Sequence, residues 1–426
     1  MERSRKTKKW GYMILKGFVK KAACILLAAA MLGTCVTPAL AEEGQTEELT
    51  SNPTPTEDPH VEDYYIEPRT NSWKDWPEGP MIEGTAAIAM DLRTGAILYA
   101  KNDNKRLYPA SITKVMTCLL ACENLDMNGQ MVMSQSAAFG IEAGSSSIYA
   151  DTDEVFTMEQ AMMALMLESA NEIALRIAEM VSGSEKKFTE LMNKRARQLG
   201  CTGTHFNNPN GLPDKYHYTT VSDMAKIAAA AWRNPLARRF MTTNFYDIPP
   251  TNKQPETRYF RNHHKMMKEN ERAYDGVLGG KTGYTNAAWC TLVTYARRGN
   301  MPVLVVVMHS IDGCYGDTAK ILDYVFDYFT QSNMGYPVGK KATGAFRYPH
   351  MALLQKNSGD VVPFYYRTKA VVTLPNGVKK KKVKRVQITM PSVLGLPYVL
   401  NEFYYRGQLV GKTLQYEQEV LSDLWK

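Results

Sequence analysis

A serine and a lysine lie three residues apart at Ser111 and Lys114, at the start of a helix predicted over 111–124. At that spacing the two side chains share one face of the helix, one turn apart. A serine hydroxyl becomes a nucleophile only when a nearby base accepts its proton, and lysine can be that base if burial or neighbouring positive charge lowers its pKa. The spacing is compatible with an activated serine, but by itself it is a weak signal, since a helix N-cap followed by a solvated lysine has the same spacing and is the more common case.

A second pair of polar residues, Ser169 and Asn171, interrupts an apolar stretch that predicts a helix over 158–182. A buried hydroxyl or amide without a partner costs about 1–3 kcal/mol, so both side chains need hydrogen-bond partners. Two interpretations remain open. The pair is either a helix cap or kink, or a proton-relay hydroxyl and an amide that face a cleft.

A third string, Lys281-Thr282-Gly283, opens a strand that precedes a predicted hairpin. A lysine beside a threonine suits recognition of a carboxylate, and a glycine on a strand permits close approach by another chain. An edge strand with a protective lysine has the same pattern.

The three strings occur together and in one order, Ser-x-x-Lys, Ser-x-Asn and Lys-Thr-Gly, and in this the chain resembles the penicillin-recognising serine acyltransferases. It is most similar to the low-molecular-mass penicillin-binding proteins that are serine-type D-alanyl-D-alanine carboxypeptidases. The resemblance covers roughly Thr85 to Val420. Further matches are Asp91-x-x-Thr94-Gly95, Pro109-Ala110, Met116-Thr117, Phe206-x-Asn208-Pro209-x-Gly211-Leu212 and Tyr284-Thr285.

The resemblance implies a role for each residue of the first two strings. Ser111 would attack the peptide carbonyl between two D-alanines to form an acyl-enzyme, with Lys114 as its general base. Ser169 would pass the proton to the leaving amine. Asn171 would hold Lys114 and the substrate amide.

The same resemblance assigns substrate binding to the third string. Lys281 and Thr282 would receive the terminal carboxylate beside Gly283, and the backbone N–H groups of Ser111 and Tyr284 would form the oxyanion hole. The implied partners are a peptidoglycan stem peptide that ends in D-Ala-D-Ala and, as covalent inhibitors, β-lactam antibiotics. No metal or other cofactor is expected, because the seven histidines show no ligand spacing such as His-Glu-x-x-His.

Three positions depart from the usual family pattern. Asn210 stands where many relatives have histidine, and Glu172 stands where aspartate is common. Neither change removes a catalytic group. Trp289 replaces a small or polar residue, which bears on substrate preference.

Two alternatives share part of this pattern. A β-lactamase must also hydrolyse its acyl-enzyme fast, and the common class uses a Glu with an Asn four residues later. Glu190 and Asn193 are only three apart, on a predicted amphipathic helix. A non-catalytic wall-binding or β-lactam-sensing module is disfavoured because nucleophile, base and relay are all intact.

The elements that must position these strings follow from hydrophobic periodicity. Strands are predicted at 86–91, 96–100, 291–296 and 303–308, and helices at 111–124, 158–182, 188–199, 221–233 and around 321–329. This order predicts an α+β fold, a β-lactamase/transpeptidase-like domain in which an antiparallel sheet built from both ends of the domain is covered by helices. We assign this catalytic domain to residues 81–335. A small all-β C-terminal domain is expected at 338–426, with strand-like runs at 370–374 and 383–388.

The N-terminal residues indicate the compartment. Residues 1–41 hold eight Lys or Arg and one Glu, and end in an Ala-x-Ala pattern at Ala39 and Ala41, which predicts a secretory signal peptide. A lipoprotein site at Cys35 is the alternative. Residues 42–80 are expected to form an acidic, Pro- and Thr-rich linker, with the folded part starting near Met81. The protein should therefore be extracytoplasmic, at the cell wall or the outer face of the membrane.

The charge outside the signal segment argues against a nucleic-acid partner. One local basic cluster is suited to weak association with an anionic surface. The chain has a net charge of +8, of which the first 41 residues carry +7, so no basic face for nucleic acid is expected. A local cluster, Lys379–Arg385, could touch anionic wall polymer or lipid, although a solvated hairpin with protective lysines has the same composition. The last eight residues are too short and too acidic for a membrane anchor. Five cysteines follow the signal segment, so at least one thiol stays free.

Overall fold

The computed structural model describes residues 60–311, 313–336, 341–347, 361–366, 369–390 and 398–417. The expected signal peptide, the linker up to residue 59 and the C-terminal tail from residue 418 lie outside these residues. Every helix in the described part of the chain is too short or too polar to span a bilayer.

A five-stranded antiparallel sheet forms the centre of the catalytic region, in the order β2-β1-β9-β8-β7. Its strands are β1 (Ala86–Asp91), β2 (Ile97–Lys101), β7 (Val277–Thr285), β8 (Trp289–Arg298) and β9 (Met301–Ser310). Pairing of β1 with β9 joins the two ends of this region, as predicted. The Lys-Thr-Gly strand β7 is one of the two edge strands, and Lys281 lies within it rather than at its start.

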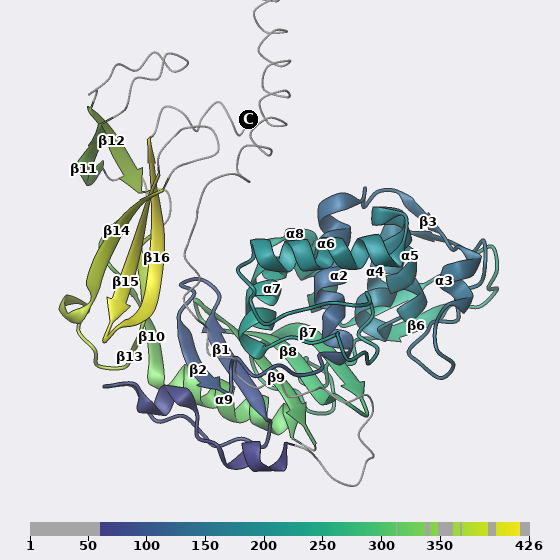
Figure 1. The fold of residues 1–426 in the computed structure, drawn as a ribbon, viewed down its shortest axis with the longest axis horizontal. Helices are drawn as coiled ribbons and strands as arrows, with labels where there is room; N and C mark the ends of the chain where they lie inside the picture. The colour runs from purple at the N-terminus through teal and green to yellow at the C-terminus, as the bar shows by residue number, and fades with distance from the viewer. Residues whose placement is uncertain are drawn as a thin grey trace, which may run out of the picture. The chain divides into compact units, whose positions relative to one another are not determined.

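Side chains that alternate along the strands divide the interior into two cores. On one face, Ile88 and Val306 pack into a cluster with the helical block. On the other face, Ala89 and Val305 pack with α9 (Cys314–Tyr328). Figure 1 shows the helices on both sides of the sheet. The α+β fold with a helix-covered antiparallel sheet is confirmed.

The helical block lies between β2 and β7 in the sequence. Its helices are η3 (Ala110–Thr113), α2 (Lys114–Asn124), α3 (Gln135–Phe139), α4 (Met158–Met163), the π-helix η4 (Ala164–Glu168), α5 (Asn171–Ser182), α6 (Glu185–Gln198), α7 (Val221–Arg233) and α8 (Pro235–Thr242). Two short strand pairs accompany them, β3 (Gln130–Val132) with β4 (Val155–Thr157) and β5 (Phe245–Ile248) with β6 (Arg258–Arg261). The single helix predicted over 158–182 is broken at Ser169, whose φ of 62° is left-handed.

The folded part begins earlier than the predicted Met81. Two short 3-10 helices, η1 (Val61–Tyr65) and η2 (Arg69–Ser72), precede it. The buried Trp76 donates from its indole Nε1 to the carbonyl of Leu98 on β2 at 3.1 Å. Residues 60–80 are thus ordered rather than linker, because their tryptophans supply apolar surface that the acidic composition of the segment obscures.

The described residues of the C-terminal region form small β-sheets, as expected. One strand pair joins β10 (Phe329–Asn333) to β13 (Val371–Pro375). A five-stranded sheet has the order β11-β12-β16-β15-β14, with strands β11 (Lys341–Arg347), β12 (Val361–Tyr366), β14 (Lys384–Met390), β15 (Tyr398–Tyr405) and β16 (Gln408–Glu417). Because β10 ends before residue 336, its pairing crosses the expected boundary, and the division into domains at 335–338 stays a prediction.

Candidate active site

Ser111 lies in η3, the turn that leads into α2, rather than in α2 itself. Ala110 before it has a left-handed φ of 50°, an arrangement that costs about 1–3 kcal/mol in a residue with a Cβ atom. Gly211 packs directly behind this turn, where a Cβ atom would collide with the Ala110 carbonyl and lie 2.9 Å from the Ser111 nitrogen. The surrounding structure therefore holds the nucleophile candidate in a strained, closely packed turn.

Lys114 begins α2 and is fully buried. Its Nζ lies 3.0 Å from Ser111 Oγ, 2.7 Å from Asn171 Oδ1 and 2.7 Å from the carbonyl oxygen of Asn210. The last two groups only accept hydrogen bonds, so a neutral amine gives its two N–H groups to them and turns its lone pair toward the serine hydroxyl. Burial, and then the charge of Lys281, holds the pKa of Lys114 well below its usual range. The geometry suits a base that takes the proton of Ser111.

Ser169 and Asn171 lie on the two sides of the break between η4 and α5. Asn171 begins α5 and its amide oxygen contacts Lys114. Ser169 is 4% exposed, and its hydroxyl has no hydrogen-bond partner among the described residues. The break is therefore a kink, as one of the two interpretations proposed. It leaves the buried Ser169 hydroxyl without a described partner, two residues before Asn171, which accepts a hydrogen bond from Lys114.

Lys281 is buried in the second half of β7, and its Nζ donates to the carbonyl of Thr282 at 3.0 Å. Burial lowers its pKa to about 7, against the opposing effect of Glu168. Because the charge of Lys281 depresses the pKa of Lys114, the first and third strings share one electrostatic environment. Thr282 is half-buried beside it, and Tyr284 is exposed at the end of the strand.

Gly283 brings the edge strand against the nucleophile turn. A Cβ atom at this position would lie 2.8 Å from the Ser111 nitrogen and 3.1 Å from the Ala110 Cβ, and it would collide with the Thr291 hydroxyl. Only glycine permits this approach, since a contact below 3.0 Å forces neighbouring atoms to shift. The eight predicted residues, from Ser111 to Tyr284, thus lie in η3, at the start of α2, at the kink and in β7 from its middle onward.

One buried contact to the nucleophile turn was not predicted. The Nε2 of His217 lies 2.8 Å from Thr113 Oγ1, and its Nδ1 accepts from the backbone N–H of Asn207 at 3.0 Å. The ring therefore carries its proton on Nε2 and donates it to Thr113. Burial lowers the pKa of His217 to about 3. His217 is 104 residues from its partner, and no local pattern links them.

Asn193, from the β-lactamase alternative, and Glu172, a departure from the family pattern, both have structural partners. The side-chain amide of Asn193 both donates to and accepts from the backbone of Phe206, at 2.8 Å each. Glu172 accepts from the Ser147 hydroxyl at 2.7 Å and from the Ile148 N–H at 2.8 Å. The helix of Glu190 and Asn193 therefore holds a loop, as expected for a structural helix.

Comparisons with known proteins show which family the chain resembles. A model of the D-alanyl-D-alanine carboxypeptidase family, peptidase S11, matches residues 74–311. The D-alanyl-D-alanine carboxypeptidase DacF of Bacillus subtilis is 33% identical over 252 residues, which are 58% of this chain and 63% of DacF. The chain thus spans less than two thirds of the length of this relative.

Solved structures extend the likeness. Penicillin-binding protein 5 from Haemophilus influenzae is 25% identical, with a TM-score of 0.64 over 80% of this chain and 98% of its own. The Streptomyces K15 DD-transpeptidase is 27% identical, with a TM-score of 0.56 over 59% of this chain and 100% of its own. Because the family model covers more than half of the chain, the chain belongs to the peptidase S11 family of D-alanyl-D-alanine carboxypeptidases.

Proposed function

We propose that this chain is a serine-type D-alanyl-D-alanine carboxypeptidase that removes the terminal D-alanine from peptidoglycan pentapeptide stems through an acyl-enzyme. The observation that carries the proposal is the environment of Lys114. Its Nζ has two obligate acceptors, Asn171 Oδ1 and the Asn210 carbonyl, and only Ser111 Oγ remains for its lone pair.

Acylation then proceeds by transfer of a single proton. Ser111 Oγ attacks the carbonyl carbon between the two D-alanines while its proton moves to Lys114 Nζ. The C–N bond breaks when the leaving amine is protonated, and the unpartnered hydroxyl of Ser169 is the group that relays this proton. Terminal D-alanine leaves, and the peptide remains as an ester on Ser111. Water hydrolyses this ester and regenerates the serine.

Substrate binding uses the edge strand β7. Lys281 and Thr282 bind the terminal carboxylate, which places a negative charge directly beside the buried ammonium group of Lys281. The backbone N–H groups of Ser111 and Tyr284 stabilise the oxyanion, and loss of such a donor typically costs about 2.7–4 kcal/mol of barrier in other enzymes. A β-lactam presents the same carboxylate and a strained amide, so it acylates Ser111 and inhibits the enzyme.

The expected compartment belongs to this proposal. A chain with a signal peptide over 1–41 is extracytoplasmic, where its substrate is, and its Lys379–Arg385 cluster is suited to a loose association with anionic wall or membrane surfaces.

The deciding experiment measures acylation and turnover on the same purified chain. Labelled penicillin should attach covalently to Ser111, and a pentapeptide ending in D-Ala-D-Ala should release one D-alanine per turnover. Ser111→Ala should abolish both. Stoichiometric labelling of another serine would overturn the assignment, and labelling without D-alanine release would favour a β-lactam-sensing module.

A further inference from the structure

One side chain on β8 reaches the nucleophile turn from the far side of β7. The Thr291 hydroxyl donates to the carbonyl oxygen of Pro109 at 2.8 Å, although the two residues are 182 positions apart. Thr291 is fully buried. Pro109 immediately precedes Ala110, whose left-handed φ sets the direction of Ser111. The bond therefore fixes the chain on the N-terminal side of the strained residue.

The glycine of the third string makes this bond possible. Gly283 and Thr291 are directly opposite each other in the β7–β8 ladder. Because Gly283 has no side chain, the Thr291 hydroxyl can occupy the space that a Cβ atom would need and extend across β7 to Pro109. The Thr291 hydroxyl of β8 thus lies beside Gly283 of β7 and is hydrogen-bonded to the nucleophile turn.

The ladder between β8 and β9 is irregular at Thr291. Cys290 pairs with Ser310, but Leu292 pairs with Val307, so the register shifts between them. Between these two pairs β9 has two residues, Met308 and His309, opposite Thr291 alone, so the bulge lies on β9 and interrupts the ladder on that side of β8. The start of β8, which carries Thr291, is thus paired regularly with β7 but only irregularly with β9, so a further tie on the β9 side bears on its position.

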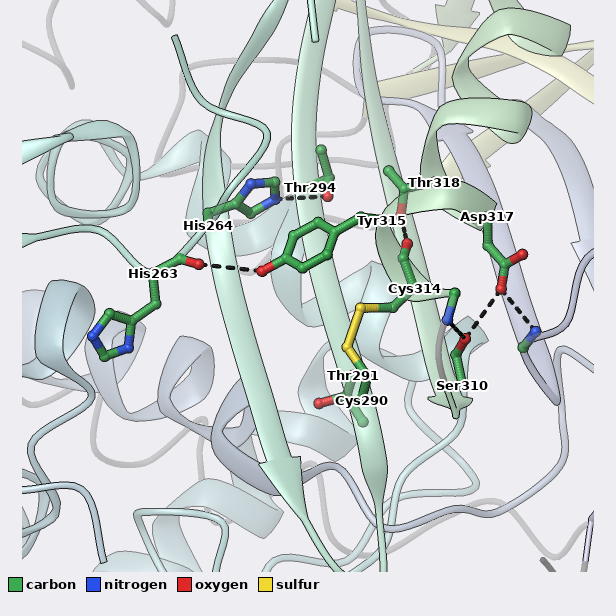
Figure 2. The surroundings of a disulfide bond; sticks show 12 residues. His263, His264, Cys290, Thr291, Thr294, Ser310, Cys314, Tyr315, Asp317 and Thr318 are labelled. Atoms are coloured by element: carbon green, nitrogen blue, oxygen red, sulfur yellow. Dashed lines mark hydrogen bonds between the residues drawn. A yellow bond between two sulfur atoms is a disulfide. The ribbon is translucent and has the colours of Figure 1, made fainter. Parts of the chain in front are cut away.

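A disulfide supplies one such tie at the neighbouring residue. Cys290 is bonded to Cys314, the first residue of α9, and Figure 2 shows this bridge between the strand and the helix next to Thr291. Cys290 also pairs with Tyr284 on β7. The disulfide thus ties Cys290 covalently to α9 at the point where the β8–β9 ladder is interrupted.

We propose that Thr291 is a positioning residue for acylation and that the Cys290–Cys314 disulfide holds it in place. The hydroxyl acts through the Pro109 carbonyl and keeps the Ser111 N–H and hydroxyl in register with β7. This inference rests on the proposed role of Ser111 as nucleophile. It predicts that loss of the Thr291 hydroxyl slows acylation without changing its dependence on pH, because the surroundings of Lys114 stay intact.

The test replaces single buried hydroxyls and measures the rate of Ser111 acylation by penicillin. Thr291→Val keeps the shape and should lower the rate by about 10-fold or more, since a displacement of about 1 Å can cost about 100-fold. Thr291→Ser keeps the hydroxyl and should restore most of the rate. Thr189→Val is the matched control, because Thr189 on α6 is also buried and also donates to a backbone carbonyl, that of Lys186 at 2.8 Å. It should acylate like the parent.

The outcomes separate this inference from the proposed function. If the parent is not labelled at Ser111, the proposed function fails. If the parent is labelled and Thr291→Val acylates as fast as Thr189→Val, or Thr291→Ser is as slow as Thr291→Val, the positioning role is wrong. Unfolding temperatures of all three variants show whether a slow rate only reflects lost stability, and a shifted pH profile would also contradict the proposal.

A double-mutant cycle tests the disulfide. Replacing Cys290 and Cys314 together by alanine should slow acylation about 3-fold or more in the parent, and should cause no further loss in the Thr291→Val background. Losses that multiply would show that the disulfide does not act through Thr291. If the double variant is poorly recovered, the folded parent reduced with dithiothreitol replaces it, with the same expected result.

Discussion

A Cβ atom on Gly283 would lie 2.8 Å from the backbone nitrogen of Ser111. Gly283→Ala should therefore push the edge strand away from the N–H that we assign to the oxyanion hole. We expect the acylation rate to fall about 100- to 1000-fold, the usual loss for one such donor. Gly316→Ala is the control, since a Cβ atom there meets nothing within 4 Å, and it should acylate like the parent. Equal rates for both variants would show that Ser111 N–H does not act at this strand.

The fall in acylation rate at acid pH should reflect protonation of Lys114. Only its neutral form accepts the Ser111 proton, so the acylation rate rises as pH rises through the pKa of Lys114, which burial holds well below the ordinary value. Asn171→Asp places a carboxylate on Nζ and raises this pKa, which should move the acid limb to higher pH by about 1–3 units. Asn128→Asp makes the same change at an exposed residue and should leave the limb in place. An unmoved limb in Asn171→Asp would contradict Lys114 as base.

The fall in kcat/KM at alkaline pH should reflect deprotonation of Lys281. Its pKa of about 7 in the free enzyme means that the cation is lost as pH rises above 7, so kcat/KM for a peptide with a free carboxylate should fall there. Lys281→Arg stays charged and should remove this alkaline limb. An amide-capped peptide needs no cation and should show no such limb in the parent. The same limb with both peptides would mean that Lys281 does not bind the carboxylate.

Acid stability should depend on His217. Its pKa is about 3 when folded against an ordinary value of 6.5, so the unfolded chain binds the proton first as pH falls. The neutral, buried form is favoured above 6.5, and stability is lost as pH falls from 6.5 to 3, by about 1.4 kcal/mol per pH unit. His217→Gln keeps an N–H for Thr113 and does not titrate, so its free energy of unfolding should fall less steeply with acid. If the free energy of unfolding of His217→Gln fell as steeply with acid as that of the parent, this prediction would be wrong.

The secondary structure and the three strings were largely predictable because they depend on local patterns. Strand alternation located the β1–β2 and β8–β9 hairpins, and helical periodicity located α6 and α7. The sequence also predicted that β1 and β9 share a sheet. The roles of the site residues came from resemblance to a family, since spacing alone left a helix cap and an edge strand open.

The contacts that shape the site were not predictable in this way. The kink at Ser169 interrupts an apolar run that continues on both sides, so periodicity favoured one helix. The His217–Thr113 and Thr291–Pro109 bonds join residues 104 and 182 positions apart, and each depends on tertiary packing that no local pattern encodes. Composition likewise assigned residues 60–80 to a linker, because the few tryptophans that anchor them are outweighed by acidic residues.

The exposed lysines Lys379–Lys382 should bind anionic surfaces weakly. The 3-10 helix η6 (Lys380–Lys382) presents them at the surface. Each charge near an anionic membrane contributes about 1 kcal/mol. The purified chain should thus bind phosphatidylglycerol vesicles or anionic wall fragments at low salt, and about 0.5 M salt should release it because charges are then screened within a few ångströms.

Replacing Lys379, Lys381 and Lys382 by Gln should weaken binding about 100-fold. The same change at three exposed lysines of α6, Lys186, Lys187 and Lys194, should not. Binding that survives high salt and needs detergent would show that a different segment anchors the protein.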